Sequence, residues 1–249
     1  MSTTPPAHSG APGRANPSAE SLPIVLVHGA WLGEWCWEQV IAALERRGRV
    51  AVAVSLRGSG CRTAENHPEI TLGDHVADVR AAIDATRSRT GAEQVVLVGH
   101  SYGGRVITRV FSEDPDHIAH LVYVDAHAPV GSAKARQPAW IEAAPPDGML
   151  EMSGVRLDAD MVGGEERLAE VRRRLVPHPA RTLREHWRVD LDDLVGRTYV
   201  HALGADAEVF RPYALVAALM PEWRYHEIDG PHLLPLTHPD ELATIIAGV

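Results

Sequence analysis

Residues 94–104, Gln94-Val95-Val96-Leu97-Val98-Gly99-His100-Ser101-Tyr102-Gly103-Gly104, decide the fold of this chain. The first half of the stretch is a short apolar run rich in β-branched residues, a pattern that predicts a buried parallel strand. Directly after the stretch, residues 106–111 carry apolar side chains at the spacing of one helical face. A serine at the tip of a sharp turn between a strand and a helix is typical of a nucleophile elbow. Ser101 is therefore the candidate nucleophile.

The glycines two positions before and after Ser101 fit the same interpretation. Side chains at Gly99 and Gly103 would collide with the strand and the helix that cross at the turn. The helix N-terminus directs unpaired N–H groups and the positive end of its dipole towards the turn. A glycine-rich connection of this kind also occurs at phosphate sites. The nucleophile interpretation therefore requires a base, an acid and a second oxyanion donor elsewhere in the chain.

The composition indicates one large globular domain. The chain has 249 residues, of which 45% are hydrophobic, and a formal net charge of −9. This charge disfavours nucleic acid as a partner, and no apolar run is long enough to span a membrane. Two cysteines, Cys36 and Cys61, make no disulfide framework and favour a cytoplasmic setting. The histidines lack metal-ligand spacing, so neither a metal nor another cofactor is expected.

Strands alternate with helices along most of the chain. Residues 1–21 are rich in Pro, Ser, Ala and Gly and are expected to be a disordered tail. Over residues 22–249 the alternation predicts an α/β fold, a doubly wound and mostly parallel sheet. Ligands bind beyond the carboxyl ends of the strands in such sheets. His28, Ser101 and Asp125 all follow predicted strands directly and are therefore expected at that edge.

The pattern changes between about residues 129 and 193. No strand is evident there, and short helical pieces are expected around residues 165–175 and 180–189. We interpret this segment as a mostly helical cap inserted over the strand ends. Its large apolar side chains are candidates to line an acyl or aromatic pocket, or to form a small core of the cap: Trp140, Met149, Met152, Met161 and Trp187.

Three motifs in order resemble those of the α/β-hydrolase superfamily. They are His28-Gly29-Ala30, the stretch 99–104, and a late acid and base at Asp206 and His232. The run 28–37, His-Gly-Ala-Trp-Leu-Gly-Glu-Trp-Cys-Trp, resembles more narrowly the methylesterase and hydroxynitrile-lyase branch. The resemblance covers nearly all of the chain after residue 21. It implies an α/β-hydrolase fold with a cap.

The resemblance also implies a role for each motif. Ser101 would be the nucleophile and His232, after the last predicted strand, the base. Asp206 follows the penultimate strand, where the acid of the family normally lies. Asp125 is the alternative acid, because some relatives use the strand after the elbow, and Glu208 is a third candidate.

The oxyanion donors would be the backbone N–H groups of Ala30 and Tyr102. Trp31, next to Ala30, is a candidate substrate contact. His28 is expected to brace this turn by hydrogen bonding.

The motif residues favour ester chemistry. Lyases of the branch carry Thr where this chain has Gly29, and Lys where it has Leu233, so hydroxynitrile cleavage is disfavoured. His100 also matches the esterase side of the branch. The leading hypothesis is a cofactor-independent serine hydrolase acting on a small-molecule ester, thioester or lactone. Two alternatives stay open: a cyclase or releasing thioesterase acting on a polyketide-like intermediate, and a non-catalytic small-molecule receptor.

Overall fold

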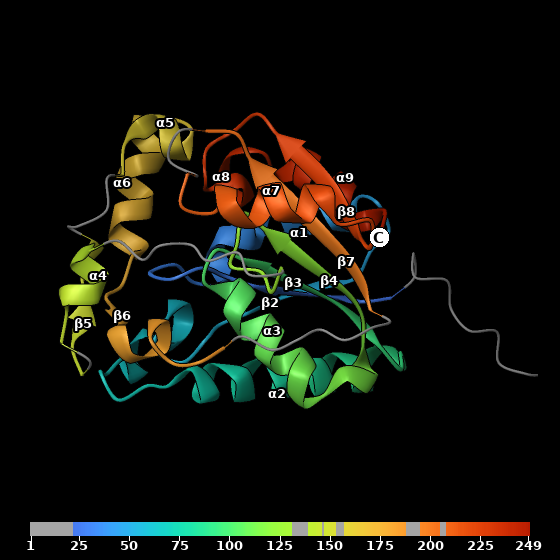
Figure 1. Cartoon of the computed structure of the whole chain (residues 1–249), viewed down its shortest axis with the longest axis horizontal. Coiled ribbons are helices and arrows are strands. Elements are labelled where there is room, and N and C mark those ends of the chain that lie inside the picture. Colours follow the sequence, from blue (N-terminus) through green and yellow to red (C-terminus); the bar gives the residue numbers. More distant parts are fainter. Residues whose placement is uncertain (1–21, 131–138, 146, 153–156, 188–194, 205–207) are drawn as a thin grey trace, which may run out of the picture.

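Six parallel strands form the centre of the fold, in the order β2-β1-β3-β4-β7-β8 (Figure 1). They are β1 (Ile24–Val27), β2 (Ala51–Val54), β3 (Val95–His100), β4 (Ile118–Val124), β7 (Gly196–Ala202) and β8 (Trp223–Ile228). Every neighbouring pair in this sheet is parallel. The computed structural model describes residues 22–130, 139–145, 147–152, 157–187, 195–204 and 208–249. The expected tail lies outside these residues. The doubly wound parallel sheet is confirmed.

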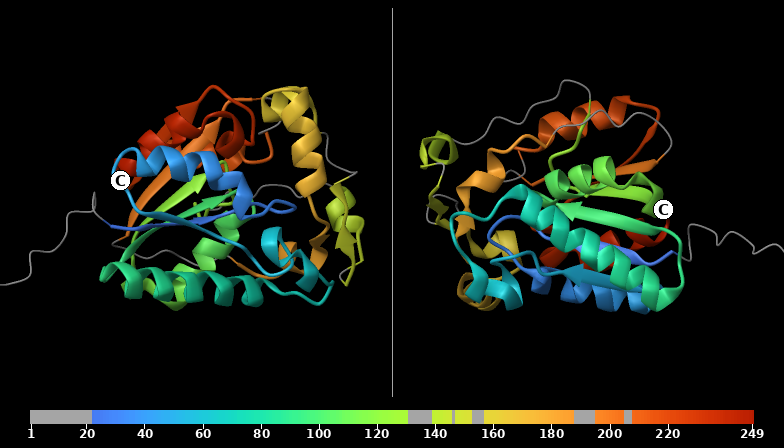
Figure 2. Two further views of the ribbon diagram at one scale, coloured as in Figure 1. Left: turned by 180° about the vertical axis from the view of Figure 1, so that it is seen from behind. Right: turned by 90° about the horizontal axis from the view of Figure 1, so that it is seen from below.

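Helices cover both faces of the sheet. Figure 2 shows α1 (Glu38–Glu45) and α9 (Pro239–Ala247) on one face and α2 (Leu72–Thr90) on the other. The helices α3 (Gly103–Glu113) and α7 (Arg211–Leu219) share a buried cluster with α2. Outside the segment between β4 and β7, the short helices of the described residues are η2 (Glu34–Trp37), η3 (Gly60–Glu65), η4 (Pro115–His117) and α8 (Leu234–Thr237).

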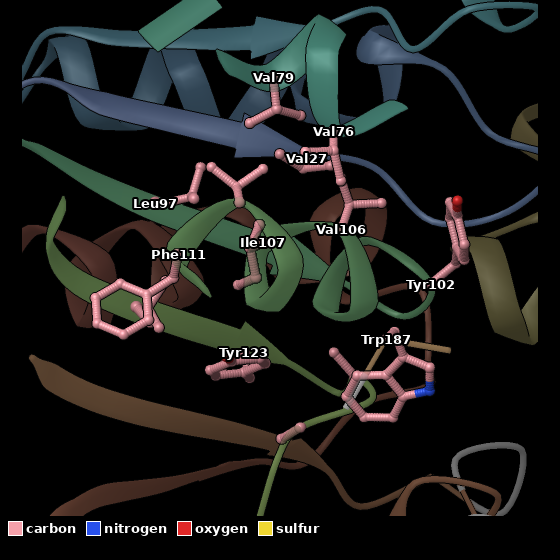
Figure 3. Close-up of a cluster of buried hydrophobic side chains, with 14 of the residues drawn as sticks. Val27, Val76, Val79, Leu97, Tyr102, Val106, Ile107, Phe111, Tyr123 and Trp187 are labelled. Carbon is pink, nitrogen blue, oxygen red and sulfur yellow. The ribbon is translucent and has the colours of Figure 1, made fainter. Parts of the chain in front are cut away.

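The strands supply apolar side chains to both faces alternately. Along β3, Val95 and Leu97 join the cluster under α2 and α3, whereas Val96 and Val98 join the cluster under α1 and α9. All four are fully buried, which explains why their run is continuously apolar. Figure 3 shows part of the first cluster, in which Val106, Ile107 and Phe111 of α3 lie together with Leu97. This packing fixes β3 and therefore the turn at its end.

The helix α2 begins as its sequence predicts. The Thr71 side chain accepts the backbone N–H of Asp74, and the Asp74 carboxylate accepts the backbone N–H of Thr71. The helix ends at Gly91, whose φ of 73° is left-handed. No helix among the described residues is long and apolar enough to cross a membrane.

The segment between β4 and β7 contains two strands that the sequence analysis missed. Here lie α4 (Ala139–Ala143), β5 (Met149–Leu150), α5 (Ala159–Val162), α6 (Glu165–Arg174), β6 (His178–Pro179) and the 3₁₀ helix η6 (Ala180–Leu183). The strands β5 and β6 pair antiparallel, and η6 replaces the longer helical piece expected at 180–189. Pro177 and Pro179 explain why the chain is extended at β6, because residues that precede proline avoid the helical region. Figure 1 shows this segment on the side towards which the β4 arrow points.

Buried histidines make the stability of this fold sensitive to acid. Burial lowers the pKa of His28 and of His75 from 6.5 to about 4. Below pH 6.5 the unfolded chain takes up protons that the folded chain excludes. The free energy of unfolding should therefore be fully retained above pH 6.5 and fall as the pH drops towards 4. Each such histidine contributes up to about 1.4 kcal/mol per pH unit.

Urea unfolding at several pH values checks this expectation. The unfolding midpoint should fall steadily between pH 6.5 and 4, and His75→Gln should make the fall shallower. His67 is exposed, so His67→Gln is the matched control and should leave the slope unchanged. A midpoint that is constant over this range would contradict the assignment of neutral buried histidines.

Candidate active site

Three strained residues converge at the carboxyl ends of neighbouring strands. Among the described residues, the non-glycine residues with positive φ are Trp31 (64°), Ser101 (55°) and Asp125 (39°). They follow β1, β3 and β4, which are adjacent in the sheet. Such backbone conformations cost about 1–3 kcal/mol each and persist where the surroundings enforce them, often at functional sites. The strain therefore points to the sheet edge that the sequence motifs indicate.

The turn at Ser101 is enforced by close backbone packing. A Cβ on Gly99 would lie 2.7 Å from the backbone of Gly103, and one on Gly103 would lie 2.6 Å from the carbonyl oxygen of Val27. Both glycines are therefore required for strand, turn and helix to cross this closely. The Ser101 carbonyl accepts the backbone N–H groups of Gly104 and His127, each at 3.2 Å. The turn that the sequence predicts is present.

His232 is paired with Asp125. Its Nδ1 lies 2.5 Å from Oδ2 of Asp125, and the Asp125 side chain is fully buried. The other carboxylate oxygen accepts the backbone N–H of Ala202 at 3.4 Å. Burial raises the pKa of Asp125, and the hydrogen bond and charge of His232 oppose that rise. The carboxylate thus holds the imidazole with its Nδ1–H inward, which leaves Nε2 to face the other way.

Asp206, the acid favoured by the sequence analysis, lies outside the described residues. Glu208, the third candidate, is exposed and pairs with Arg211 at 3.0 Å. Asp125 is the alternative acid of the sequence analysis, and in the structure its carboxylate is hydrogen-bonded to His232. Position after a strand could not separate the candidates, because both strand ends reach the same edge of the sheet.

The turn after β1 packs directly against Ser101. A Cβ on Gly29 would lie 2.9 Å from Cβ and 3.4 Å from Oγ of Ser101. Within the described part of the chain, the backbone N–H groups of Ala30 and Tyr102 have no acceptor. Both residues are buried, and unpaired donors in such places are rare. Two such donors on neighbouring turns can bind an anionic oxygen.

His28 braces this turn through both ring nitrogens. Nδ1 donates to the carbonyl oxygen of Gly29 at 2.8 Å, and Nε2 accepts the backbone N–H of Leu56 at 3.3 Å. The lowered pKa of His28 agrees with this neutral tautomer. With both nitrogens occupied, the ring joins the turn to the chain after β2.

Two rings that the sequence analysis did not assign to the site pack against the His232 imidazole. Phe210 stacks on it with a centroid distance of 4.8 Å and an interplanar angle of 9°. His100 contacts it at 4.7 Å and 34°. The sequence contained a signal for His100, since it precedes Ser101, whereas Phe210 stands before α7 with no motif around it. The base candidate is thus held by packing as well as by Asp125.

The candidate pocket residues are distributed over different parts of the molecule. Trp31 donates from Nε1 to the Leu150 carbonyl at 2.7 Å, so it joins the turn after β1 to β5, where Met149 is half-buried. Trp187 is buried in the same cluster as Tyr102 and packs on His127 at 5.7 Å. Figure 3 shows Trp187 and Tyr102 at one end of that cluster.

The remaining candidates are Met161, Met152 and Trp140. Met161 of α5 packs against the other cluster, which also contains residues of α6 and α8, whereas Trp187 belongs to the first cluster. Met152 is half-buried. The side chain of Trp140 lies outside the described part of the chain. A side chain's share in a pocket depends on how the intervening segment folds, which periodicity alone does not encode.

Comparison with known proteins identifies the family of the chain. The model of the family described as "Alpha/beta hydrolase family" matches residues 24–245. A carbendazim hydrolyzing esterase from a Nocardioides strain is 32% identical over 248 residues, covering 90% of this chain and 98% of the relative. Esterase PIR7B of rice is 31% identical over 147 residues, covering 58% of this chain and 52% of the relative.

A solved structure shares the fold. The crystal structure of a methylesterase from Arabidopsis superposes with a TM-score of 0.73 at 20% identity, covering 90% of this chain and 97% of that one. The relatives agree with the resemblance to the methylesterase side of the branch. The chain thus belongs to the alpha/beta hydrolase family, and its relatives are esterases.

Proposed function

We propose that this protein is a cofactor-independent serine esterase that works through an acyl-enzyme, with Ser101 as nucleophile, His232 as base and Asp125 as acid. The observation that carries the proposal is the 2.5 Å contact between His232 Nδ1 and the buried Asp125 carboxylate. That contact lies at the strand ends where Ser101 sits in a strained turn. A buried carboxylate that orients a histidine near a serine is the arrangement that acyl transfer requires.

The proposed reaction follows from these positions. His232 Nε2 takes the proton of the Ser101 hydroxyl as Oγ attacks the carbonyl carbon of the ester. The imidazolium that forms keeps its Nδ1–H on Asp125, whose negative charge stabilises it. His232 then gives the proton to the leaving alcohol as the tetrahedral intermediate collapses. Water, activated by the same histidine, releases the acid from Ser101.

The oxyanion of each tetrahedral intermediate would lie between the N–H groups of Ala30 and Tyr102. Tyr102 stands at the start of α3, where the helix dipole adds to the attraction for negative charge. Loss of one such donor typically slows a reaction by about 10²- to 10³-fold. The close approach of Gly29 to Ser101 supports this assignment, because it brings the turn that carries Ala30 against the nucleophile.

We further propose that residues 129–193 form an inserted cap that bounds the pocket on the acyl side. Trp31 and Trp187 support this role, since each joins that segment to the neighbourhood of Ser101 through a hydrogen bond or ring contacts. Two aromatic side chains at this boundary favour a flat, apolar acyl or alcohol group. Carbendazim is therefore included among the test substrates, since the relative that matches over nearly its full length is a carbendazim hydrolyzing esterase.

Labelling with a fluorophosphonate tests the proposal. The purified chain should form a covalent adduct that maps to Ser101 at neutral pH, and it should hydrolyse p-nitrophenyl esters. Ser101→Ala should lose both properties, while Ser112→Ala is the matched control because Ser112 lies at the exposed end of α3.

The same assay separates the alternatives. Methyl esters, thioesters and carbendazim are compared as substrates, and products are identified to distinguish hydrolysis from cyclisation. Absence of an adduct on Ser101, together with ligand binding that Ser101→Ala leaves unchanged, would contradict the esterase and support a receptor.

A further inference from the structure

We propose that His100 is a positioning residue for the catalytic base: it fixes the main chain at His232 and so holds the His232–Asp125 pair in line with Ser101. The proposal rests on the proposed function, since it takes His232 as the base of that reaction. His100 is the last residue of β3 and directly precedes the nucleophile candidate. One strand end would therefore present the nucleophile and also position its base.

The contact between His100 and His232 involves both backbone and ring. His100 Nε2 lies 2.9 Å from the backbone carbonyl oxygen of His232. A carbonyl oxygen only accepts, so the proton of His100 is on Nε2 and the lone pair is on Nδ1. The two rings also touch, with centroids 4.7 Å apart. His100 is fully buried, so water does not compete for this hydrogen bond.

The other nitrogen of His100 shows why the ring stays neutral. Nδ1 is buried and has no hydrogen-bond partner among the described residues. A Cβ on Gly29 would lie 3.1 Å from it, so the atoms it faces are those of a backbone turn. The ring also has the edge-on ring of Trp37 and the histidines His28 and His232 around it. Burial and these two histidines lower the pKa of His100 well below its usual value.

A neutral His100 suits the proposed chemistry. During the reaction His232 becomes positively charged, and a second charge 4.7 Å away would oppose that step. His100 instead contributes a fixed donor to the loop between β8 and α8, which carries His232. Asp125 holds the ring at Nδ1, and His100 holds the main chain from which that ring projects. Two-point attachment limits small displacements, and about 1 Å of misplacement costs about 10²-fold in rate.

A matched pair of variants isolates the hydrogen bond. His100→Gln keeps an N–H donor near the position of Nε2, and His100→Met has similar length without a donor. In the full chain, kcat for a p-nitrophenyl ester should fall about 10- to 100-fold in His100→Met, with a much smaller change in KM. His100→Gln should regain most of the loss.

His120 supplies the control, because it is also a buried histidine on a strand. It lies on β4 and its Nε2 is hydrogen-bonded to the Thr198 hydroxyl of β7 at 2.8 Å. His120→Gln should keep the kcat and KM of the unaltered chain. If His100→Met fails to fold, His100→Asn takes its place, since its shorter amide cannot reach the carbonyl. Equal activity of the Met and Gln variants would overturn the proposal.

The pH profile distinguishes positioning from proton transfer. The acid limb of kcat/KM should keep its midpoint in His100→Gln, because His232 alone accepts the proton from Ser101. Loss or displacement of that limb in His100→Gln would show that His100 itself accepts the proton, which also overturns the proposal.

A readout without turnover keeps this inference separate from the esterase assignment. The proton shared by His232 Nδ1 and Asp125 should give a far-downfield proton NMR signal in the unaltered chain and in His100→Gln. The signal should broaden or disappear in His100→Met. If the signal behaves in this way but no ester is turned over, the esterase proposal fails and the positioning role stands. A signal unchanged in His100→Met would contradict the positioning role.

Discussion

Replacing Asp125 with asparagine is expected to lower kcat by about 10³- to 10⁴-fold with little change in KM. The carboxylate accepts the Nδ1–H of His232 at 2.5 Å from a fully buried position. An amide at this place can donate to Nδ1, which would put the histidine proton on Nε2. His232 would then have no lone pair for the Ser101 proton. The imidazolium would also lose the negative charge that stabilises it.

Steady-state hydrolysis of a p-nitrophenyl ester checks this result, with fluorophosphonate labelling of Ser101 as a second measure. Asp206→Asn is the comparison, because Asp206 is the other acid that the sequence offers. Asp206→Asn should retain activity of the same order as the unaltered chain. The reverse pattern, with Asp206→Asn inactive and Asp125→Asn active, would return the acid to the strand end after β7.

The acid partner of His232 shows which parts of the site can be predicted from the sequence and which cannot. The sheet and the Ser101 turn could be predicted, because burial on both faces imposes apolar strands and the tight crossing imposes Gly99 and Gly103. The partner of His232 could not be predicted. It depends on which of two strand ends comes within hydrogen-bond distance, and that is a tertiary distance with no local signature. The φ of 39° at Asp125 marks it only once the backbone is known.

The structure of the segment between β4 and β7 was harder to predict for a different reason. The strands β5 and β6 have two residues each, so neither has enough length for a period of two to be seen. Phe210 likewise has no sequence neighbour that indicates its stacking on His232. His100 lies between these cases. Its place before Ser101 was visible, but its hydrogen bond to the His232 carbonyl spans residues far apart in the chain.

The second large effect is expected from Gly103→Ala, which should reduce both stability and activity. The new Cβ would lie 2.6 Å from the carbonyl oxygen of Val27 and 2.9 Å from that of His28. Both atoms belong to the backbone at the end of β1 and cannot rotate aside. Alanine favours a helix by about 0.5–1 kcal/mol over glycine, but overpacking of this kind costs about 1–3 kcal/mol, so the net effect is destabilising.

The activity loss follows from the direction of that strain. Moving α3 away from β1 separates the N–H group of Tyr102 from that of Ala30, and it displaces Ser101 with them. A shift of about 1 Å is worth about 10²-fold in rate, so labelling of Ser101 should slow by that order. Gly73→Ala is the matched control, because Gly73 is exposed in α2 and its new Cβ would meet only the Thr71 hydroxyl at 3.5 Å.

Urea unfolding and labelling rates, measured on both variants, decide the point. Gly73→Ala should be slightly stabilised and should label at the rate of the unaltered chain. Gly103→Ala should unfold at lower urea concentration and should label more slowly. A Gly103→Ala chain that loses stability yet labels at the normal rate would show that the β1 and β3 ends move independently. In that case the strained turn would hold Ser101 by itself, and the approach of Gly29 would not set the geometry of the oxyanion donors.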